Sequence, residues 1–598
     1  MISLYCLREK KMKEKLFLKC YQALVLLLVS FFITACGGDN VTPVATAQSL
    51  TVNEDTTDNA ITLAGTDADG NSLTYTIATQ PTNGTLSGTA PNVTYTPKAD
   101  FFGTETFTFT VNDGTVDSAP ATVTITVSDV AEPIVKDTKP WEHGKLKVSD
   151  DGHMLQHEDG TGFFWMADTA WFMVAKMSRE EIDTYLTDRV NKGFTVVMIN
   201  IMSSPWDENR YGDKPYPMEW PKVMPAEEGK KPYRIDQPIT TLGNNPLDAE
   251  EYDYWDHVDY TINKAAEKGL YIGLVVTWRI AAVEYINKDK NLYDTYSKFL
   301  AQRYTNTPNI VWLNGGDVYG GDDKDGEDVQ SYEVWDWIGE MIKAEDPNHL
   351  MSFHGSPSSA KHHNKEWLDF NMIESGHWID SVRQNAEIVR DYNKSPSKPV
   401  VDGETRYEEI GKNLGTESER IEAFEVREIA YYQLFSGAFG HTYGHNSIWQ
   451  IATQEDIDNK KLAYDPISTW EEALNAPGGQ QMQYISELMQ SRPIVGRVPD
   501  QSLIASGDST KIRATRGDGY AFIYSTSGQT IEIALGKISG DNVNIWSYNP
   551  RTGEAKALKN GLENSGVYTF TPEGIQEFGN DWVVVIDDAS KGYGKPGE

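Results

Sequence analysis

The chain has 598 residues, of which 39 % are hydrophobic and 11 % aromatic, an ordinary composition for a globular protein of several domains. Its 53 Lys and Arg against 88 Asp and Glu give a formal net charge of −35, which opposes binding to nucleic acid. The three cysteines are Cys6, Cys20 and Cys36. If the first 35 residues are removed as a leader, a disulfide scaffold, a thiolate zinc site and a cysteine nucleophile are all excluded.

Residues 1–35 have the pattern of a secretory signal peptide, with a basic segment followed by the apolar run 21–35. The run ends Ile33-Thr-Ala-Cys36, which resembles the lipobox of bacterial lipoproteins. The resemblance implies that Cys36 is lipidated and anchors the exported protein to the cell envelope. We expect the membrane that holds this anchor to be the outer membrane. Removing a net charge of +4 from −35 would leave −39. The alternative is a plain cleaved peptide with an incidental cysteine.

An all-β module is predicted after a short tether at 36–46. Residues 47–130 are rich in Thr, Val and Asp and alternate β-branched with polar residues, as in 105–111 and 121–127. This pattern predicts a β-sandwich of about seven strands, and the segment resembles the cadherin-like or immunoglobulin-like (Ig-like) modules of bacterial surface proteins. Thr66–Asn71 carries carboxylates that could ligate calcium, but we favour a simple turn. Residues 131–140 form a predicted linker.

The central part of the chain, 141–490, alternates apolar runs with helical patterns. The runs are mostly continuous, which is typical of strands buried on both faces; they are 163–167, 195–201, 271–276, 309–313, 350–353, 370–373, 399–401 and 440–443. Helices are expected after the capping-box spacing Ser178–Glu181 and at 254–268, 292–305, 332–344, 381–393 and 418–435. Residues 357–369 contain no convincing long helix.

Eight strands alternating with helices predict a (β/α)₈ TIM barrel for 141–490. The last stretch, 491–598, returns to short strands separated by Gly- and Asp-bearing turns, including a hairpin turn at 549–553. The predicted fold class is therefore multidomain α/β and all-β. The barrel is flanked by an N-terminal Ig-like β-sandwich and a C-terminal β-sandwich.

Carboxylates follow two of the predicted barrel strands, at the end where active sites of this fold lie. The fourth strand closes as Trp312-Leu-Asn-Gly-Gly-Asp317, and the seventh as Val400-Val-Asp-Gly-Glu404. Asp317 and Glu404 would face each other across the barrel mouth, and glycoside hydrolysis needs two carboxyl groups flanking the scissile bond. Glu374 competes for the catalytic role because it also ends a strand. Asp402 would orient or perturb Glu404.

Structural alternatives exist for both carboxylates. Asp317 could cap the next helix, and Glu404 could pair with Arg406 in the barrel wall. No metal-ligand spacing is present, because His362 and His363 are adjacent on a polar stretch and His441 and His445 lie on no common helical face. We therefore expect no metal and no cofactor.

The aromatic residues give an independent indication of a sugar substrate. Of the 16 tryptophans, 13 lie between residues 165 and 470, and several directly follow predicted strands. Flat aromatic faces stack on sugar rings. The candidate substrate-contacting residues are Asp168, Trp278, Arg279, Asn314, His377, His441 and Trp449.

The segment 141–490 resembles the apiosidase-like barrel of glycoside hydrolase family 140. The resemblance rests on the runs 162–171, 185–194, 309–317 and 398–404 together. The tail after 491 is similar to the β-module, named after a collagen-binding domain of a collagenase, that often follows such barrels. The resemblance implies a retaining glycosidase with Asp317 as acid/base and Glu404 as nucleophile. It further implies removal of a β-linked apiose from a pectin-type side chain.

Two other functions remain open at this point. One is an endo-acting hydrolase on another polysaccharide, and the other is a non-catalytic surface protein that binds glycans. Retention requires carboxyl groups about 5–5.5 Å apart, whereas about 6.5–9.5 Å indicates inversion. An acidic pectin would also need a local basic contact, for which Arg279 and Arg406 are candidates.

Overall fold

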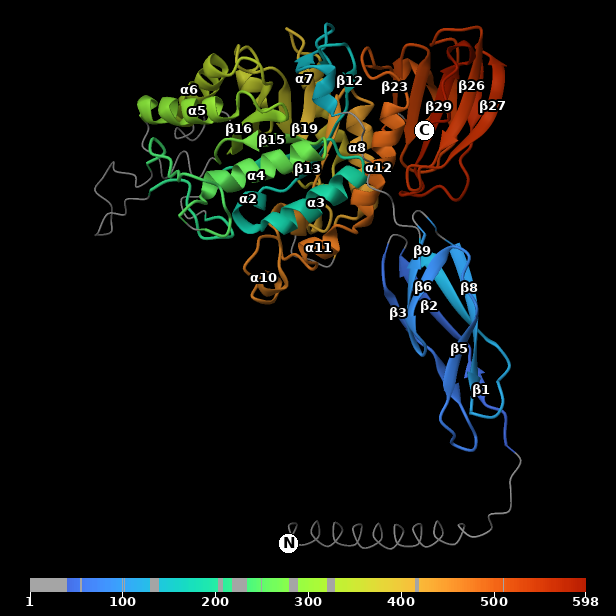
Figure 1. Ribbon diagram of the computed structural model, residues 1–598. Coiled ribbons are helices and arrows are strands. Elements are labelled where there is room, and N and C mark those ends of the chain that lie inside the picture. The colour runs from blue at the N-terminus through green and yellow to red at the C-terminus, as the bar shows by residue number, and fades with distance from the viewer. Residues whose placement is uncertain are drawn as a thin grey trace, which may run out of the picture. The chain divides into compact units, whose positions relative to one another are not determined.

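A computed structural model describes residues 40–53, 56–98, 101, 103–128, 139–202, 208–217, 234–248, 250–278, 289–319, 329–414, 419–508 and 510–598. The chain divides into two compact units, residues 1–132 and 133–598 (Figure 1). The leader, Cys36 and the predicted linker up to 138 lie outside the described residues. No helix within the described ranges is both long and apolar enough to cross a membrane.

The first unit is a β-sandwich. Its strands are β1 (Val44–Thr46), β2 (Gln48–Asn53), β3 (Asn59–Thr62), β4 (Ala64–Thr66), β5 (Thr74–Thr79), β6 (Gly84–Thr89), β7 (Asn92–Pro97), β8 (Gly103–Asn112) and β9 (Ala121–Ser128). They form the sheets β2-β9-β8-β5 and β3-β7-β6 and the pair β1-β4. In β8 Phe107, Phe109 and Val111 are buried while the threonines between them face outward, as the alternating pattern predicts. Asp67 Oδ1 accepts the N–H groups of Asp69 and Asn71, which makes this run a turn.

The second unit is built around parallel strands. They are β13 (Trp165–Thr169), β14 (Val196–Asn200), β15 (Tyr271–Val275), β16 (Ile310–Tyr319), β17 (Met351–Ser356), β18 (Asn371–Glu374), β19 (Val400–Glu404) and β20 (Gly440–Tyr443). Six of them form one parallel sheet, a half-barrel in the order β17-β16-β15-β14-β13-β20, and β18 and β19 form a separate parallel pair. Each of the eight predicted apolar runs therefore contains a parallel strand. A short antiparallel sheet precedes them and consists of β10 (Leu146–Val148), β11 (Leu155–His157) and β12 (Gly162–Phe163).

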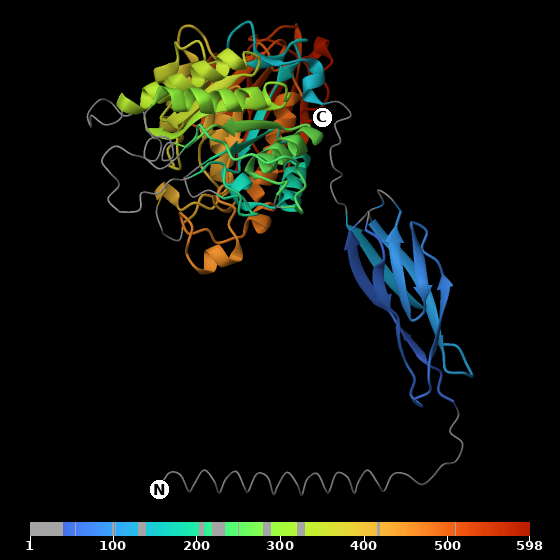
Figure 2. The same ribbon diagram turned by 60° about the vertical axis from the view of Figure 1, so that its left-hand side comes forward.

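Helices connect these strands in the order that the sequence predicts. The longer ones are α3 (Arg179–Asn191), α4 (Tyr254–Glu267), α5 (Lys290–Tyr304), α6 (Val329–Glu345), α7 (Ser381–Tyr392), α8 (Ala423–Leu434) and α12 (Pro477–Gln490). The short ones are α2 (Met173–Lys176), α9 (Asn446–Trp449), α10 (Gln454–Asp458) and α11 (Trp470–Ala473). The predicted capping box is present, because Ser178 and Glu181 exchange hydrogen bonds at the start of α3. Helices α5 and α6 lie side by side (Figure 2). Between β17 and β18 only the 3-10 helix Ser359–His362 forms.

The fourth strand, β16, is longer than its apolar run indicates. It continues through Gly315 and Gly316 to Tyr319 and pairs with β17 on both sides of a bulge between Gly315 and Val318. Asp317 sits in this bulge with φ of 47°, in the left-handed region. The strand therefore does not end at the paired glycines. The bulge re-aims the side chain of Asp317 instead.

The C-terminal part is a second all-β module. Its strands are β21 (Val498–Pro499), β22 (Ile504–Ser506), β23 (Ile512–Gly517), β24 (Tyr520–Ser525), β25 (Ile531–Ala534), β26 (Asn542–Tyr548), β27 (Ala555–Glu563), β28 (Val567–Phe570) and β29 (Trp582–Asp588). They form the sheets β21-β23-β24-β29-β26-β27 and β22-β25-β28. The predicted turn 549–553 joins β26 to β27, a strand that the sequence reading missed. Strand β27 is mostly exposed and rich in lysine, so it lacks the apolar signal of a strand.

Aromatic stacking and a buried ion pair fasten this module to the part built around parallel strands. Tyr431 of α8 stacks on Tyr524 with ring centroids 4.6 Å apart. Beside this stack, Arg427 donates two hydrogen bonds of 2.7 Å to Asp581, and both side chains are buried. One continuous apolar cluster runs from β13 into β24 and β29. The two parts therefore share a core.

We expect Asp581→Ala to lower the free energy of unfolding by about 3–5 kcal/mol, because it leaves the Arg427 guanidinium buried without its partner. Chemical denaturation of the full chain measures the change. The control is Glu573→Ala, which removes one partner of the exposed pair Lys556–Glu573 and should change stability by less than about 1 kcal/mol. Equal effects of the two substitutions would contradict the role of the buried pair.

Candidate active site

A partly enclosed cavity of about 340 Å³ lies at the carboxyl ends of the parallel strands. Three of the carboxylates that line it come from strands, Asp317 from β16, Glu374 from β18 and Glu404 from β19. The rest of the lining is mostly polar and aromatic and consists of Ser356, Pro357, Ser375, Gly376, His377, Trp378, Arg383, Gln384, Glu387, Tyr407, Leu414, Tyr464 and the tryptophans 171, 278 and 449. The structure thus brings the two predicted catalytic carboxylates and the competing Glu374 to one cavity.

Glu404 is held by two histidines. Its Oε1 lies 3.4 Å from His377 Nε2, and its Oε2 lies 3.6 Å from His354 Nε2. Burial alone would raise the pKa of Glu404, but the hydrogen bond and charge of His377, followed by His354 and the Tyr407 hydroxyl, hold it below its ordinary range. Glu404 is therefore ionised at neutral pH, as a nucleophile must be.

His377 is oriented for this contact by its own backbone neighbourhood. Its Nδ1 lies 2.8 Å from the carbonyl oxygen of Thr405, which can only accept a hydrogen bond. The carboxylate near Nε2 is also an acceptor, so both ring nitrogens face acceptor oxygens. His377 thereby presents Nε2 to Glu404.

Glu374 has the opposite electrostatic environment. Burial, followed by the negative charges of Glu404, Asp317 and Asp402, raises its pKa well above the ordinary value. Its nearest histidine contact is His354 Nδ1 at 4.0 Å. Glu374 therefore holds its proton more tightly than Glu404 does, which makes it the poorer nucleophile, and its protonated form could donate a hydrogen bond.

Asp402 lies behind Glu404 and takes part in positioning it. Its carboxylate accepts hydrogen bonds of 2.5 Å from Ser375 Oγ and from Gln433 Nε2, and it also accepts the N–H of Glu404. Burial raises the pKa of Asp402 to about 7, against the lowering effect of these bonds. Asp402 is absent from the cavity lining, so it acts on the site through Glu404 and Ser375.

Asp317 is half-buried on β16. It accepts a hydrogen bond of 3.2 Å from the indole N–H of Trp278, which also lines the cavity. A Cβ at Gly316 would come within 2.4 Å of the Trp278 ring, so the second glycine is needed for this close approach. The bulge and the indole together fix where the Asp317 carboxyl points.

The predicted substrate-contacting residues divide into three groups. Trp278, His377 and Trp449 line the cavity. Asp168, Asn314 and His441 are fully buried and are not among its lining residues. Arg279 lies outside the described residues.

Asp168 and Asn314 are bonded within the protein core. Asp168 pairs with Arg189 Nε at 2.5 Å and accepts a hydrogen bond from Tyr185. Asn314 donates to the carbonyl of Trp335. His441 is buried without a hydrogen bond between either ring nitrogen and any described residue, and burial lowers its pKa to about 3, which keeps this ring neutral.

Of the two basic groups expected near an acidic substrate, Arg406 is also internal. It donates to Glu428, Gln384, Ser381 and backbone carbonyls and is fully buried. Arg383, at the start of α7, lines the cavity instead and is exposed. It is the one Lys or Arg among the described lining residues. The sequence analysis missed it because it follows no strand directly.

Tyr407 and Tyr464 were also missed. Tyr407 lies three residues beyond Glu404 and accepts a hydrogen bond from Trp171 Nε1. Tyr464 comes from the irregular segment between α10 and α11, where the sequence has no signal for a site. Within the described ranges, no group of three or more His, Cys, Asp or Glu is arranged to hold a metal ion.

Comparison with known proteins assigns each part of the chain to a family. Residues 149–496 match the family model "Apiosidase-like, catalytic domain". Residues 498–587 match a collagen-binding domain of a collagenase, and residues 40–126 match a bacterial Ig domain. The resemblance drawn from the sequence is thereby confirmed. The comparison with curated proteins found no match.

Two solved structures are similar over most of the chain. One, named as a glycoside hydrolase, is 34 % identical with a TM-score of 0.66, over 76 % of this chain and 100 % of its own. The other, a glycoside hydrolase family 5 protein from Bacteroides vulgatus, is 33 % identical with a TM-score of 0.65, over 77 % of this chain and 97 % of its own.

The histidine contact predicts a pH dependence of glycosidase activity. Because the pKa of Glu404 is lowered from 4.5, the acidic limb of kcat/KM should lie below pH 4.5. His377→Gln removes the charge that favours the carboxylate, so the pKa of Glu404 should rise and the limb should move to higher pH. The control is His143→Gln, at a half-exposed histidine paired with Asp159. A limb that stays in place in His377→Gln would contradict this electrostatic role.

Proposed function

Because the chain belongs to the apiosidase-like family of glycoside hydrolases, we propose that it is a retaining, exo-acting enzyme that removes a terminal sugar, apiose in the first instance, from pectic or related side chains. The observation that carries the proposal is the pairing of an ionised Glu404 with Asp317 in one cavity. The carbohydrate substrate and the hydrolysis follow from the family. The sugar, the stereochemistry and the exo action are the proposed part.

The proposed mechanism has two steps. In the first, Glu404 attacks the anomeric carbon while Asp317 donates a proton to the leaving glycosidic oxygen. In the second, Asp317 takes a proton from water, and the water oxygen displaces Glu404 from the glycosyl-enzyme. The indole N–H of Trp278 holds the Asp317 carboxyl in both steps.

The charge distribution supports Glu404 over Glu374 as the nucleophile. Both residues end neighbouring strands, β18 and β19, but only Glu404 has a histidine within 3.6 Å of each carboxylate oxygen. Burial, followed by the negative charge of the other carboxylates, raises the pKa of Glu374 and so favours its protonated form. A neutral Glu374 suits a hydrogen bond to a substrate hydroxyl.

The shape and lining of the cavity support exo action on an acidic substrate. A volume of about 340 Å³ is near the lower end of the range of ligand pockets, about 300–1,000 Å³. Such a cavity suits a terminal sugar better than an extended chain. The exposed guanidinium of Arg383 offers a bidentate partner for a uronate carboxylate, in a chain whose net charge of −35 otherwise opposes acidic substrates.

We also infer that the eight parallel strands close into a (β/α)₈ barrel, with the β18-β19 pair between β17 and β20. Two hydrogen bonds support this closure. Asp369 N–H donates to the carbonyl of Met351 at the β17 side, and Phe439 N–H donates to the carbonyl of Val400 at the β20 side. A closed barrel would place Asp317 and Glu404 on opposite sides of one mouth.

The location of the protein is proposed from its first 36 residues. A lipid on Cys36 would anchor the enzyme to the outer membrane of a bacterial envelope, and the run Ile33–Cys36 supports this. The domains proposed for the exported chain are the tether 36–46, the Ig-like β-sandwich 47–130, the linker 131–140, the barrel 141–490 and the β-sandwich 491–598.

The direct test is release of sugar from a panel of pectic, algal and neutral polysaccharides. We expect the exported form of the chain to release a monosaccharide from a pectic substrate. Asp317→Asn should lower this activity by roughly 10²- to 10⁴-fold, because general acid and base catalysis contributes that much. Glu404→Gln should lower it at least as far. Chromatography of the products measures both the sugar and the rate.

The matched control is Glu374→Gln, because an amide has nearly the shape of a protonated carboxyl. It should retain activity to within about tenfold. Oligosaccharides as the first products would indicate endo action. No release by the wild type, with binding retained in all variants, would contradict the proposal and favour a non-catalytic glycan-binding role.

A further inference from the structure

An irregular segment between α10 and α11, residues 459–469, brings an aromatic ring to the cavity. Tyr464 of this segment is 43 % exposed and lines the cavity. Its ring meets that of His377 edge to face, with centroids 6.2 Å apart. Because His377 contacts Glu404, Tyr464 is two contacts away from the proposed nucleophile.

The backbone of this segment is held in an unfavourable conformation. Lys460, Tyr464 and Asp465 have φ of 50°, 55° and 42°, which L-residues other than glycine seldom adopt. Such strain persists only where surrounding contacts over-determine the backbone, and it clusters at functional sites.

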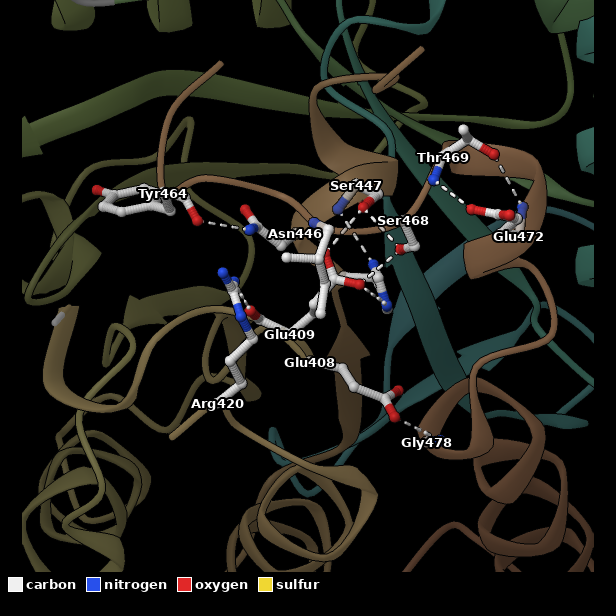
Figure 3. A network of polar contacts seen from close by, with 12 residues as sticks. Glu408, Glu409, Arg420, Asn446, Ser447, Tyr464, Ser468, Thr469, Glu472 and Gly478 are labelled. Carbon is white, nitrogen blue, oxygen red and sulfur yellow. Dashed lines mark hydrogen bonds and ion pairs between the residues drawn. The ribbon is translucent and has the colours of Figure 1, made fainter. Parts of the chain in front are cut away.

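Three side chains from outside the segment bind its backbone on both sides of Tyr464. Gln450 Nε2 donates a hydrogen bond to the carbonyl of Ala463, and Gln450 Oε1 accepts one from the N–H of Ala463, each at 3.0 Å. Asn446 Nδ2 donates to the carbonyl of Tyr464 at 2.9 Å. Arg420 donates to the carbonyl of Asp465 at 2.8 Å. Figure 3 shows the Asn446 and Arg420 side chains converging on this stretch.

Glu409 fixes the far end of the segment. Its carboxylate accepts the N–H of Ile467 at 2.8 Å and the hydroxyls of Ser468 at 2.6 Å and Ser447 at 3.1 Å (Figure 3). Glu409 itself has φ of 73°, so its own backbone is also strained. Only 11 % of its side chain is exposed. One buried carboxylate thus ties the segment to the start of α9.

Asn446 links the segment to a second aromatic residue of the cavity. Its Oδ1 accepts hydrogen bonds from Gln450 Nε2 at 3.1 Å and from the indole N–H of Trp449 at 3.4 Å. The same amide therefore bonds the indole of Trp449 and the backbone of Tyr464, which both line the cavity. The relative positions of these two aromatic side chains are fixed by one buried side chain.

We propose that residues 459–469 form a fixed wall of the sugar-binding subsite. In this wall Tyr464 is a specificity-determining residue that contacts the substrate, and Asn446 and Glu409 are positioning residues. The proposal rests on the proposed function for the identity of the substrate. A half-exposed tyrosine offers a ring face to the C–H face of a sugar and a hydroxyl for a hydrogen bond. Burial and the negative charges of Glu404, Asp317 and Glu374 raise the pKa of Tyr464, so its hydroxyl remains a donor near those carboxylates.

The first test compares Tyr464→Ala and Tyr464→Phe on the pectic substrate that the wild type cleaves. Loss of the ring should raise KM by roughly tenfold and change kcat less, which is the size of a good aromatic contact. Tyr464→Phe keeps the ring and should recover most of the loss. The control is Ile467→Ala, because Ile467 is 65 % exposed on the same segment and its backbone bond to Glu409 remains.

The second test addresses the positioning residues. Glu409→Ala removes the acceptor for Ile467 N–H and both serine hydroxyls, so it should raise KM in the same direction as Tyr464→Ala. Glu409→Gln keeps a side chain of the same length with an oxygen that accepts hydrogen bonds. It should restore KM to within a few-fold of the wild type. A merely structural role for Glu409 would lower the melting temperature without this split between KM and kcat.

Binding separates this proposal from the proposed function. Size-fractionated pectic oligosaccharides are titrated calorimetrically into Asp317→Asn and into the double variant Asp317→Asn with Tyr464→Ala. The comparison measures what Tyr464 contributes to the binding affinity in the absence of turnover. Weaker binding by the second variant supports the proposal even if the wild type releases no sugar. Equal binding and equal KM would overturn it while leaving the proposed function intact. Absence of binding by either variant, with no release by the wild type, would overturn both.

Discussion

Repulsion among carboxyl groups is the constraint on which the site depends. Asp317, Glu374 and Glu404 share a cavity of about 340 Å³, and Asp402 lies directly behind Glu404. Buried carboxylates that share one cavity cannot all be ionised unless nearby positive charges or hydrogen-bond donors compensate their charges. The protein places its compensation unevenly, with His377 and His354 at Glu404 and none of equal strength at Glu374. Glu404 and Glu374 differ in charge because of this uneven compensation. The proposed division of catalytic roles follows from that difference.

The rest of the second unit keeps these groups in place. Arg406, two residues beyond Glu404, donates hydrogen bonds to Gln384 and Ser381 of α7 and to Glu428 of α8. Helix α8 is in turn fixed to the C-terminal module by Arg427 and Tyr431. The C-terminal β-module thus supports the helix that carries Glu428, the partner of Arg406. A stability role for this module agrees with these contacts.

Much of this architecture could be predicted from the sequence, because continuous apolar runs and capping residues are local signals. The rule that function gathers at strand ends found Asp317, Glu374 and Glu404. It also selected Asp168, Asn314 and His441, which the structure buries away from the cavity. The rule gives the end of the strands but not the direction of a side chain, and neither the bulge at Asp317 nor the ion pair of Asp168 with Arg189 has a local signal. Tyr464 and Arg383 were missed because they depend on how segments distant in sequence meet.

The most direct test of the account is to trap the glycosyl-enzyme. An activated 2-deoxy-2-fluoro glycoside of the released sugar slows the second step, so a retaining enzyme accumulates the covalent intermediate. Mass spectrometry of the intact protein should then show one added glycosyl group, and peptide mapping should locate it on Glu404. An adduct on Glu374, or no adduct together with a product of inverted anomeric configuration, would contradict the assignment of Glu404 as the nucleophile.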